Sequence, residues 1–134
     1  MRAEFSRILR QDRWCGVIYN ERRLNGDGFH DGYERLLRDF GIDYEIVRRQ
    51  HLTRERMQGF FAPCEMRCAV FPNAQSLTLE ALEGRIISSS YMPKEGHARY
   101  DAMRGAIARL FETYQAGGRV RLDYECAVYY GRLG

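Results

Sequence analysis

The final segment of the chain constrains the fold more than any other feature. From Val120 onward, apolar and polar residues alternate with a period of two, which is the pattern of a β-strand with one buried face. This pattern predicts a long strand that closes the chain. Its apolar side consists of Val120, Leu122, Tyr124, Cys126, Val128 and Tyr130, and Arg121, Asp123 and Glu125 lie on the other side.

Two further apolar segments predict the other strands of a sheet. Trp14–Tyr19 is a continuous apolar run, typical of a strand buried on both faces inside a parallel sheet, and Met66–Phe71 is the second candidate. Helical spacing predicts helices between the strands, the clearest of them over Met103–Tyr114, and Tyr44–Val47 predicts a short extended piece. Residues of capping type stand before three of the predicted helices, namely Asp27, Thr53 and Thr78. The order indicates one α/β domain over residues 1–134, with a three-stranded mixed sheet and helices packed on it.

Composition narrows the class of protein. A hydrophobic content of 45% and an aromatic content of 13% are typical of a globular protein. No apolar run reaches the roughly 18 residues of a membrane-spanning helix, so we expect a soluble, cytoplasmic protein without a membrane partner. The net charge is +3, and the 21 basic residues are interspersed with 18 acidic ones. A nucleic-acid partner is not expected, because such proteins gather their basic residues on one face.

The cysteines and histidines do not predict a metal site. Cys64 and Cys68 have the C-x3-C spacing of zinc ligands, but no second pair follows them. Cys15 and Cys126 lie in predicted strands, where a cysteine usually acts as a small hydrophobic residue. The histidines share no motif and are expected to be solvated, so neither a catalytic residue nor a metal ligand is predicted. These histidines are His30, His51 and His97.

Five segments resemble the C-terminal half of a class I S-adenosylmethionine-dependent methyltransferase of the small-molecule, type 11-like group. Glu4–Leu9 resembles the helix before the family's fifth strand, Trp14–Asn20 the fifth strand itself, and Phe71–Gln75 the sixth strand. Gly84–Tyr91, with the sequence GRIISSSY, is the most specific of the segments. Val120–Leu133 is similar to the seventh strand, which is antiparallel in this family.

The resemblance implies a partial Rossmann-like methyltransferase fold. In the family the seventh strand lies between the fifth and the sixth, so the order 5-7-6 would make these three strands neighbours without the rest of the sheet. One departure is a lost turn, because Gln11, Asp12 and Arg13 stand where the family has Pro-Gly-Gly. We expect a reshaped loop there.

A second departure concerns the cofactor. The family's glycine-rich turn and its ribose-binding acidic residue belong to the first four strands, which the resemblance places before residue 1. The one G-x-G of this chain, Gly26-Asp27-Gly28, follows the wrong strand for that role. We therefore expect no cofactor for this chain alone, and S-adenosylmethionine only if a partner chain completes it.

The resemblance also suggests where a substrate pocket would lie. Asn20 ends a strand of parallel type, where ligands bind in open α/β sheets, although a turn-forming asparagine is the favoured interpretation there. Ser89, Ser90 and Tyr91 fall in the region that caps the family's active-site pocket. The structural alternative is that the serines end a helix and that Tyr91 packs at its tip.

The same resemblance leaves one edge of the segment that matches the fifth strand without a neighbouring strand. In the intact fold the fourth strand would flank the fifth, so the edge carrying Trp14, Val17, Ile18 and Tyr19 would be exposed and prone to aggregation. We expect this edge, or the apolar surface beside it, to form a two-fold homodimer interface.

The sequence indicates three alternative functions. The first is a truncated methyltransferase-like protein that is not catalytic alone. The second is one subunit of a split methyltransferase whose cofactor-binding half is a separate chain. The third is a small-molecule binding module that uses the residual pocket around Asn20 and Tyr91.

Overall fold

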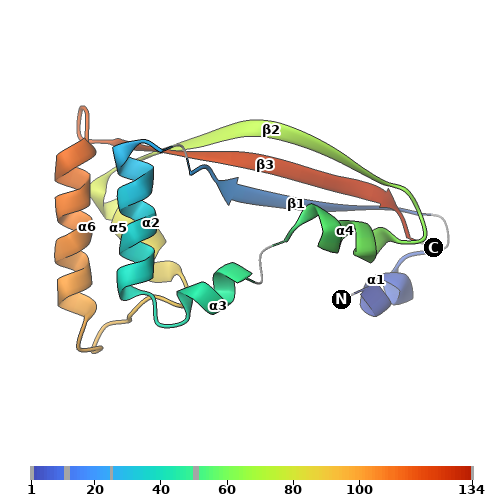
Figure 1. The fold of residues 1–134 in the computed structure, drawn as a ribbon, viewed down its shortest axis with the longest axis horizontal. Coiled ribbons are helices and arrows are strands. Elements are labelled where there is room, and N and C mark those ends of the chain that lie inside the picture. The colour runs from blue at the N-terminus through green and yellow to red at the C-terminus, as the bar shows by residue number, and fades with distance from the viewer. Residues whose placement is uncertain (1, 11–12, 25, 50–51, 134) are drawn as a thin grey trace. The chain divides into compact units, whose positions relative to one another are not determined.

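The computed structural model describes residues 2–10, 13–24, 26–49 and 52–133. The predictions made for Gln11, Asp12 and His51 fall outside the described residues. The elements follow one another along the chain in the order drawn in Figure 1. They are α1 (Arg2–Ile8), β1 (Trp14–Arg22), α2 (Gly28–Phe40), α3 (Tyr44–Arg49), α4 (Arg54–Phe61), β2 (Met66–Leu77), α5 (Leu79–Ser88), α6 (Tyr100–Tyr114) and β3 (Val120–Arg132).

The three strands form one sheet in the order β1-β3-β2. The predicted α/β class and three-stranded sheet are confirmed. The prediction of a mixed sheet is wrong, because the sheet is antiparallel. The last strand lies in the middle and runs opposite to both neighbours, so no two parallel strands are hydrogen-bonded to each other.

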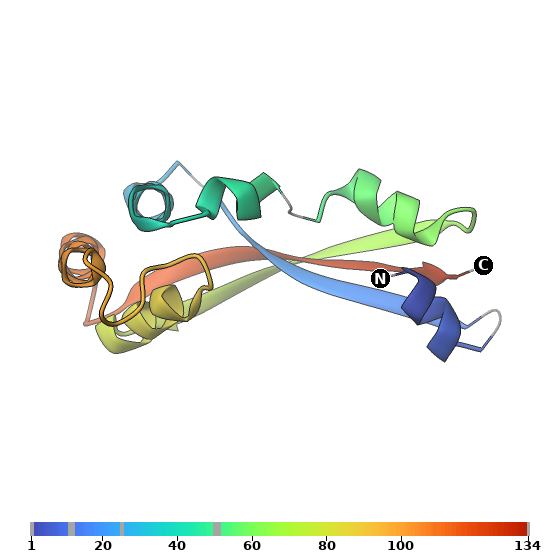
Figure 2. The same ribbon diagram turned by 90° about the horizontal axis from the view of Figure 1, so that it is seen from below.

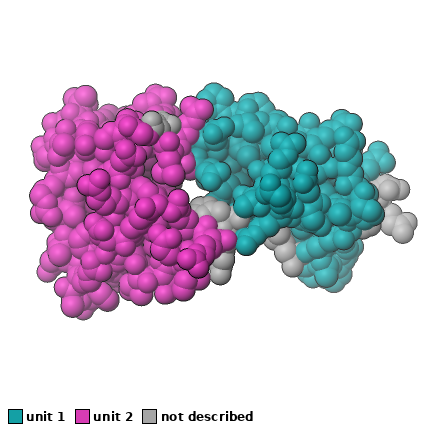
Figure 3. All heavy atoms as spheres, in the orientation of Figure 1, with its two compact units in different colours: residues 1–21, 51–73, 124–134 teal, residues 22–50, 74–123 magenta. Residues whose placement is uncertain are grey.

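Residues of all three strands are shared between two compact units, shown in different colours in Figure 3. Unit 1 comprises residues 1–21, 51–73 and 124–134, and therefore holds α1, α4 and most of the sheet. Unit 2 comprises residues 22–50 and 74–123, and holds α2, α3, α5 and α6. Each unit has buried apolar residues of its own.

In unit 1, α1 and α4 pack against one side of the sheet. The rings of Phe5 and Phe60 meet edge to face at 5.4 Å between centroids, and Phe61 is completely buried. The prediction that β1 is buried on both faces is wrong. Cys15 and Val17 face the helices, whereas the residues that alternate with them are exposed. The buried cluster consists of Cys15, Met57, Phe60, Phe61, Tyr129 and Leu133.

In unit 2, α2 and α6 lie side by side in both views of the ribbon (Figures 1 and 2). Gly32 allows this approach, since a Cβ atom there would come within 2.5 Å of Leu110 Cδ1. After α6, Gly117 and Gly118 adopt φ values of 60° and 74° and turn the chain into β3, a conformation that favours glycine. The completely buried apolar residues of this unit are Leu37, Leu82, Ile86, Met103, Ile107 and Leu122.

Local capping signals are confirmed at three helices. Asp27 caps α2 by accepting a hydrogen bond from the His30 backbone N–H at 2.9 Å. Thr53 and Thr78 accept corresponding bonds at the starts of α4 and α5. No helix in the described part of the chain is long and apolar enough to cross a bilayer.

Two local predictions differ from the structure. Tyr44–Val47 lies in the helix α3 and is not extended. On this helix the Tyr44 side chain is buried, and its hydroxyl donates a hydrogen bond to Glu34. The alternation of β3 is confirmed at Val120, Leu122 and Tyr124, which are buried. Further along the strand the odd-numbered Tyr129 becomes the buried residue, so the buried side changes within β3.

Candidate functional site

The predicted pocket residues divide between the two units. Asn20 is exposed near the end of β1 in unit 1, where its side-chain oxygen accepts a hydrogen bond of 3.3 Å from Asn73 of β2. Ser89, Ser90 and Tyr91 belong to unit 2 and directly follow α5. The pocket predicted from these four residues therefore stays a prediction.

The structural alternative for the serines agrees with the local geometry. Ser89 is the C-cap residue of α5, and its carbonyl oxygen accepts a hydrogen bond of 2.7 Å from the Lys94 ammonium group. Ser90 is exposed and Tyr91 is half-buried. The Tyr91 ring packs against Tyr44 at 5.1 Å between centroids, and its carbonyl oxygen accepts the backbone N–H of Ile42 at 2.8 Å.

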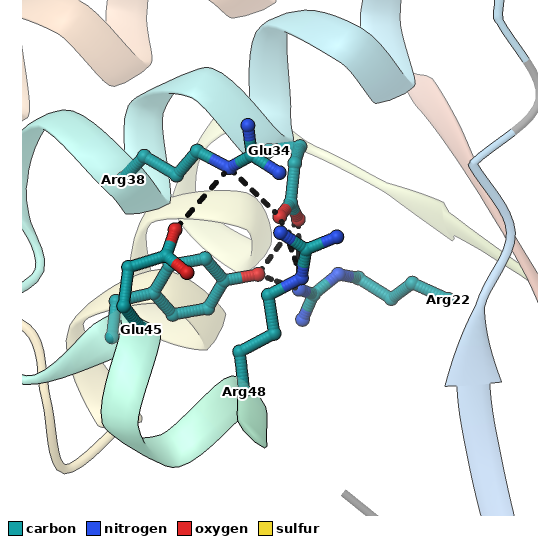
Figure 4. A network of polar contacts seen from close by, with 6 residues as sticks. Arg22, Glu34, Arg38, Glu45 and Arg48 are labelled. Atoms are coloured by element: carbon teal, nitrogen blue, oxygen red, sulfur yellow. Dashed lines mark hydrogen bonds and ion pairs between the residues drawn. The ribbon is translucent and has the colours of Figure 1, made fainter.

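Tyr91 thereby adjoins a polar cluster that the sequence did not predict (Figure 4). At its centre is Glu34 of α2, which is buried. Glu34 Oε2 accepts a hydrogen bond of 2.7 Å from the Tyr44 hydroxyl and one of 3.5 Å from Arg22 Nη2. The Arg22 guanidinium also donates to the Tyr44 oxygen at 3.1 Å and lies over the ring of Tyr33, 5.1 Å from its centroid.

Two further arginines approach the other oxygen of the same carboxylate. Arg38 Nε lies 3.4 Å and Arg48 Nε 3.7 Å from Glu34 Oε1. Among the described residues, Oε1 has no hydrogen-bond partner, so these are ion pairs at longer range. Arg38 Nε also lies 3.6 Å from Glu45 Oε1. A buried carboxylate is costly unless it is paired, and here the end of β1, α2 and α3 each supply a positive group.

Burial raises the pKa of two tyrosines in and beside this cluster, and this limits the chemistry that they can perform. Burial, and then the hydrogen bond to Glu34, raises the pKa of Tyr44 well above its usual range. Burial likewise raises the pKa of Tyr33. Both phenols therefore stay protonated and act as donors, not as bases or nucleophiles. The cluster orders three elements around one charge, which is a structural role.

His30 is the second buried polar residue of unit 2, and the prediction that it is solvated is wrong. It is only 4% exposed. Its Nδ1 lies 2.8 Å from Asp27 Oδ2, and its Nε2 accepts the backbone N–H of Asp123 at 3.0 Å. Because a backbone N–H can only donate, Nε2 must carry a lone pair, and the proton is on Nδ1. Both ring nitrogens are thus occupied in joining α2 to β3.

The four cysteines are free thiols that differ in burial. Cys15 is buried, and burial raises the pKa of its thiol, so the nucleophilic thiolate is disfavoured. Cys126, predicted to be in the core, is only half-buried. Cys64 and Cys68 are half-buried free thiols. Within the described ranges, no group of three or more potential ligands could hold a metal ion.

The predicted dimer edge is an edge of the sheet, since β1 pairs with β3 alone. Its four named residues point to two sides of that sheet. Trp14 and Ile18 are 54% and 69% exposed. Val17 packs against the buried cluster and Tyr19 is half-buried.

No protein-family model matches the chain, and no curated protein is similar to it above the significance threshold. The methyltransferase relationship therefore stays a prediction from the sequence.

Proposed function

We propose that this chain is a methyltransferase-like domain that has no catalytic activity on its own and that persists as a homodimer. The observation that carries the proposal is the position of β1 at the edge of the sheet with Trp14 and Ile18 exposed. An exposed apolar edge strand is a site of association in soluble proteins unless something covers it. A second copy of the chain covers this edge or the apolar surface beside it.

The strand order supports the relationship on which this proposal rests. The resemblance implied that the last strand would lie between the other two, and the sheet order is β1-β3-β2. The buried polar groups described above support a structural role, because Glu34, His30 and Tyr44 are each held by neighbouring groups of unit 2.

Two measurements on the purified chain test the proposal. Light scattering during gel filtration should give the mass of a dimer at micromolar concentration. Calorimetric titration with S-adenosylmethionine should give no binding heat, with S-adenosylhomocysteine as a matched second ligand. A clean monomer would remove the association, and saturable binding of S-adenosylmethionine would remove the non-catalytic assignment.

The same edge favours a second candidate, a split methyltransferase. In the intact fold the fourth strand would pair with the β1 edge, so a separate cofactor-binding chain could occupy it in place of a second copy. This candidate predicts that a fragment with a glycine-rich strand-turn-helix co-purifies with the chain and that the pair binds S-adenosylmethionine. If every such fragment elutes separately from the chain, the candidate is rejected.

A further inference from the structure

One side of the sheet in unit 1 carries neither of the helices described in that unit, α1 and α4. The side facing α1 and α4 includes Cys15, Tyr129 and Cys68, so residues that alternate with these along each strand point to the opposite side. Direct contacts confirm that they share this side. The Trp14 ring lies 6.0 Å from that of Tyr130, and the Asn20 and Asn73 side chains are hydrogen-bonded. We call this surface the open side.

The centre of the open side is apolar and aromatic. Trp14 is 54% and Ile18 69% exposed on β1, and Phe71 is 54% exposed on β2. Val128 and Tyr130 lie between them on the central strand and are half-buried. An apolar centre of this kind is what a covered interface presents, and tryptophan and tyrosine are enriched among residues that dominate binding.

The two ends of the open side are polar and differ in chemistry. At one end Arg132 places its guanidinium over the Trp14 ring, 5.9 Å from the centroid, and Arg67 is exposed on β2. At the other end lie the bonded amides of Asn20 and Asn73. One end thus offers charged donors and the other offers amide oxygens. If a second copy faces the first with its strands reversed, the arginine end of each copy meets the amide end of the other, so the two surfaces are complementary.

We propose that a second copy of this chain covers the open side, so that the homodimer is formed by two sheet faces packed against each other with their strands antiparallel. This inference rests on the proposed homodimer and places its contact on the apolar surface beside the β1 edge, not on the backbone groups of the edge itself. A two-fold axis across the strands brings each arginine end over the amide end of the other copy. The alternative axis along the strands would bring four guanidinium groups together, which is unfavourable.

The size of the open side fits a small interface between two copies. Three strands about 4.8 Å apart, each with about seven residues of about 3.3 Å rise, cover on the order of 300 Å² in projection. Side-chain relief increases this area, so two such faces bury on the order of 1,000 Å² in total, near the lower limit for a specific interface. Aligned packing of two faces about 10 Å apart completes a β-sandwich over the exposed aromatic residues.

Adjacent residues of β2 provide a matched test. Phe71 and Val70 are 54% and 53% exposed, but they point to opposite sides of the same strand. Phe71→Arg should weaken dimerisation at least tenfold in sedimentation equilibrium, and Val70→Arg should leave it unchanged. Ile18→Arg, on the far strand of the open side, should act like Phe71→Arg. Far-ultraviolet circular dichroism confirms that each variant is folded.

The outcomes separate this inference from the proposed function. A monomeric wild-type chain would overturn both. A wild-type dimer that survives Phe71→Arg and Ile18→Arg would overturn the face-to-face inference alone, because association would then use another surface. Equal weakening by Val70→Arg and Phe71→Arg would also overturn it, since the effect would not depend on the side of the sheet.

Discussion

Asp27 has two structural tasks at the beginning of α2. Its carboxylate caps the helix through the His30 backbone N–H at 2.9 Å and holds the His30 ring through Nδ1 at 2.8 Å. The hydrogen bond from the His30 backbone N–H, together with that from its side chain, lowers the pKa of Asp27 below its ordinary value. The folded chain therefore favours the ionised form of this carboxyl group more than the unfolded chain does.

The lowered pKa of Asp27 predicts a pH-dependent contribution to stability. A depressed carboxyl pKa contributes stability that is fully present above the unfolded value of about 3.9 and is lost as the pH falls through the folded value. Asp27→Asn retains a capping side chain without the charge, so it should destabilise the chain at pH 6 and progressively less towards pH 3. Urea unfolding of both proteins across this range measures the difference, and a gap that does not change with pH would contradict the prediction.

Tyr44 provides the shortest hydrogen bond to the buried Glu34 carboxylate, at 2.7 Å. Tyr44→Phe removes this donor and leaves the ring in place, so the free energy of unfolding should fall by about 1.5–3 kcal/mol, the range for bonds to charged groups. Tyr114→Phe is the control, because Tyr114 is exposed. Equal effects of the two substitutions in urea unfolding would show that the Glu34 bond contributes little.

For helices and strands, the predictions from the sequence were most accurate where a periodic polarity pattern or a capping residue determines the local structure. The predicted helix over Met103–Tyr114 lies within α6, and the caps at Asp27, Thr53 and Thr78 are found as predicted, because both depend on local chemistry. A strand was predicted over Met66–Phe71, yet β2 continues through Pro72 to Leu77. Because β2 is an edge strand, the missing proline N–H need not interrupt its ladder.

Predictions failed where distant segments decide the outcome. The apolar run of β1 does not reveal that one of its sides lacks a helix, because α1 and α4 cover only the side with Cys15 and Val17. The cluster around Glu34 was missed for a similar reason. In the sequence, only Glu34 and Arg38 can be recognised as an ion pair, because they are four residues apart on one helix. Arg22 and Arg48 reach Glu34 from other elements, which the sequence does not reveal. The pocket predicted at Asn20 and Tyr91 depends on residues of different units, and stays a prediction.

Replacing either of two glycines in helices should change the stability of the chain. Gly84 lies inside α5, and a Cβ atom added there would have no other atom within 4 Å, so Gly84→Ala should stabilise the chain by about 0.5–1 kcal/mol through helix propensity. Gly28 begins α2, and a Cβ atom there would clash with the hydroxyl oxygen at the tip of the exposed Tyr114 side chain. Gly28→Ala should therefore stabilise the chain less than Gly84→Ala, because the Tyr114 ring must move. Thermal unfolding of both variants measures the effects, and equal stabilisation by both would contradict the packing described for Gly28.

For the whole molecule, the proposed dimer can be built with two relative orientations of its sheets. In the antiparallel orientation Asn20 of one copy lies near the arginine end, with Arg67 and Arg132, of the other. In the parallel orientation the two Asn20 residues lie near each other. A charge introduced at this position therefore has an effect whose sign depends on the orientation.

Asn20→Asp should strengthen the dimer if its strands are antiparallel, because the new carboxylate faces the partner's arginines. An exposed ion pair contributes about 0.2–1 kcal/mol, so each of the two symmetric pairs should tighten association by up to about fivefold, and the gain should shrink as salt is raised. Sedimentation equilibrium at low and high salt measures the change. Val70→Asp adds the same charge to the other side of the sheet and should have no such effect. In the parallel orientation the two new carboxylates would repel each other, so weaker association of Asn20→Asp at low salt would reject the antiparallel arrangement while leaving the face-to-face contact in place.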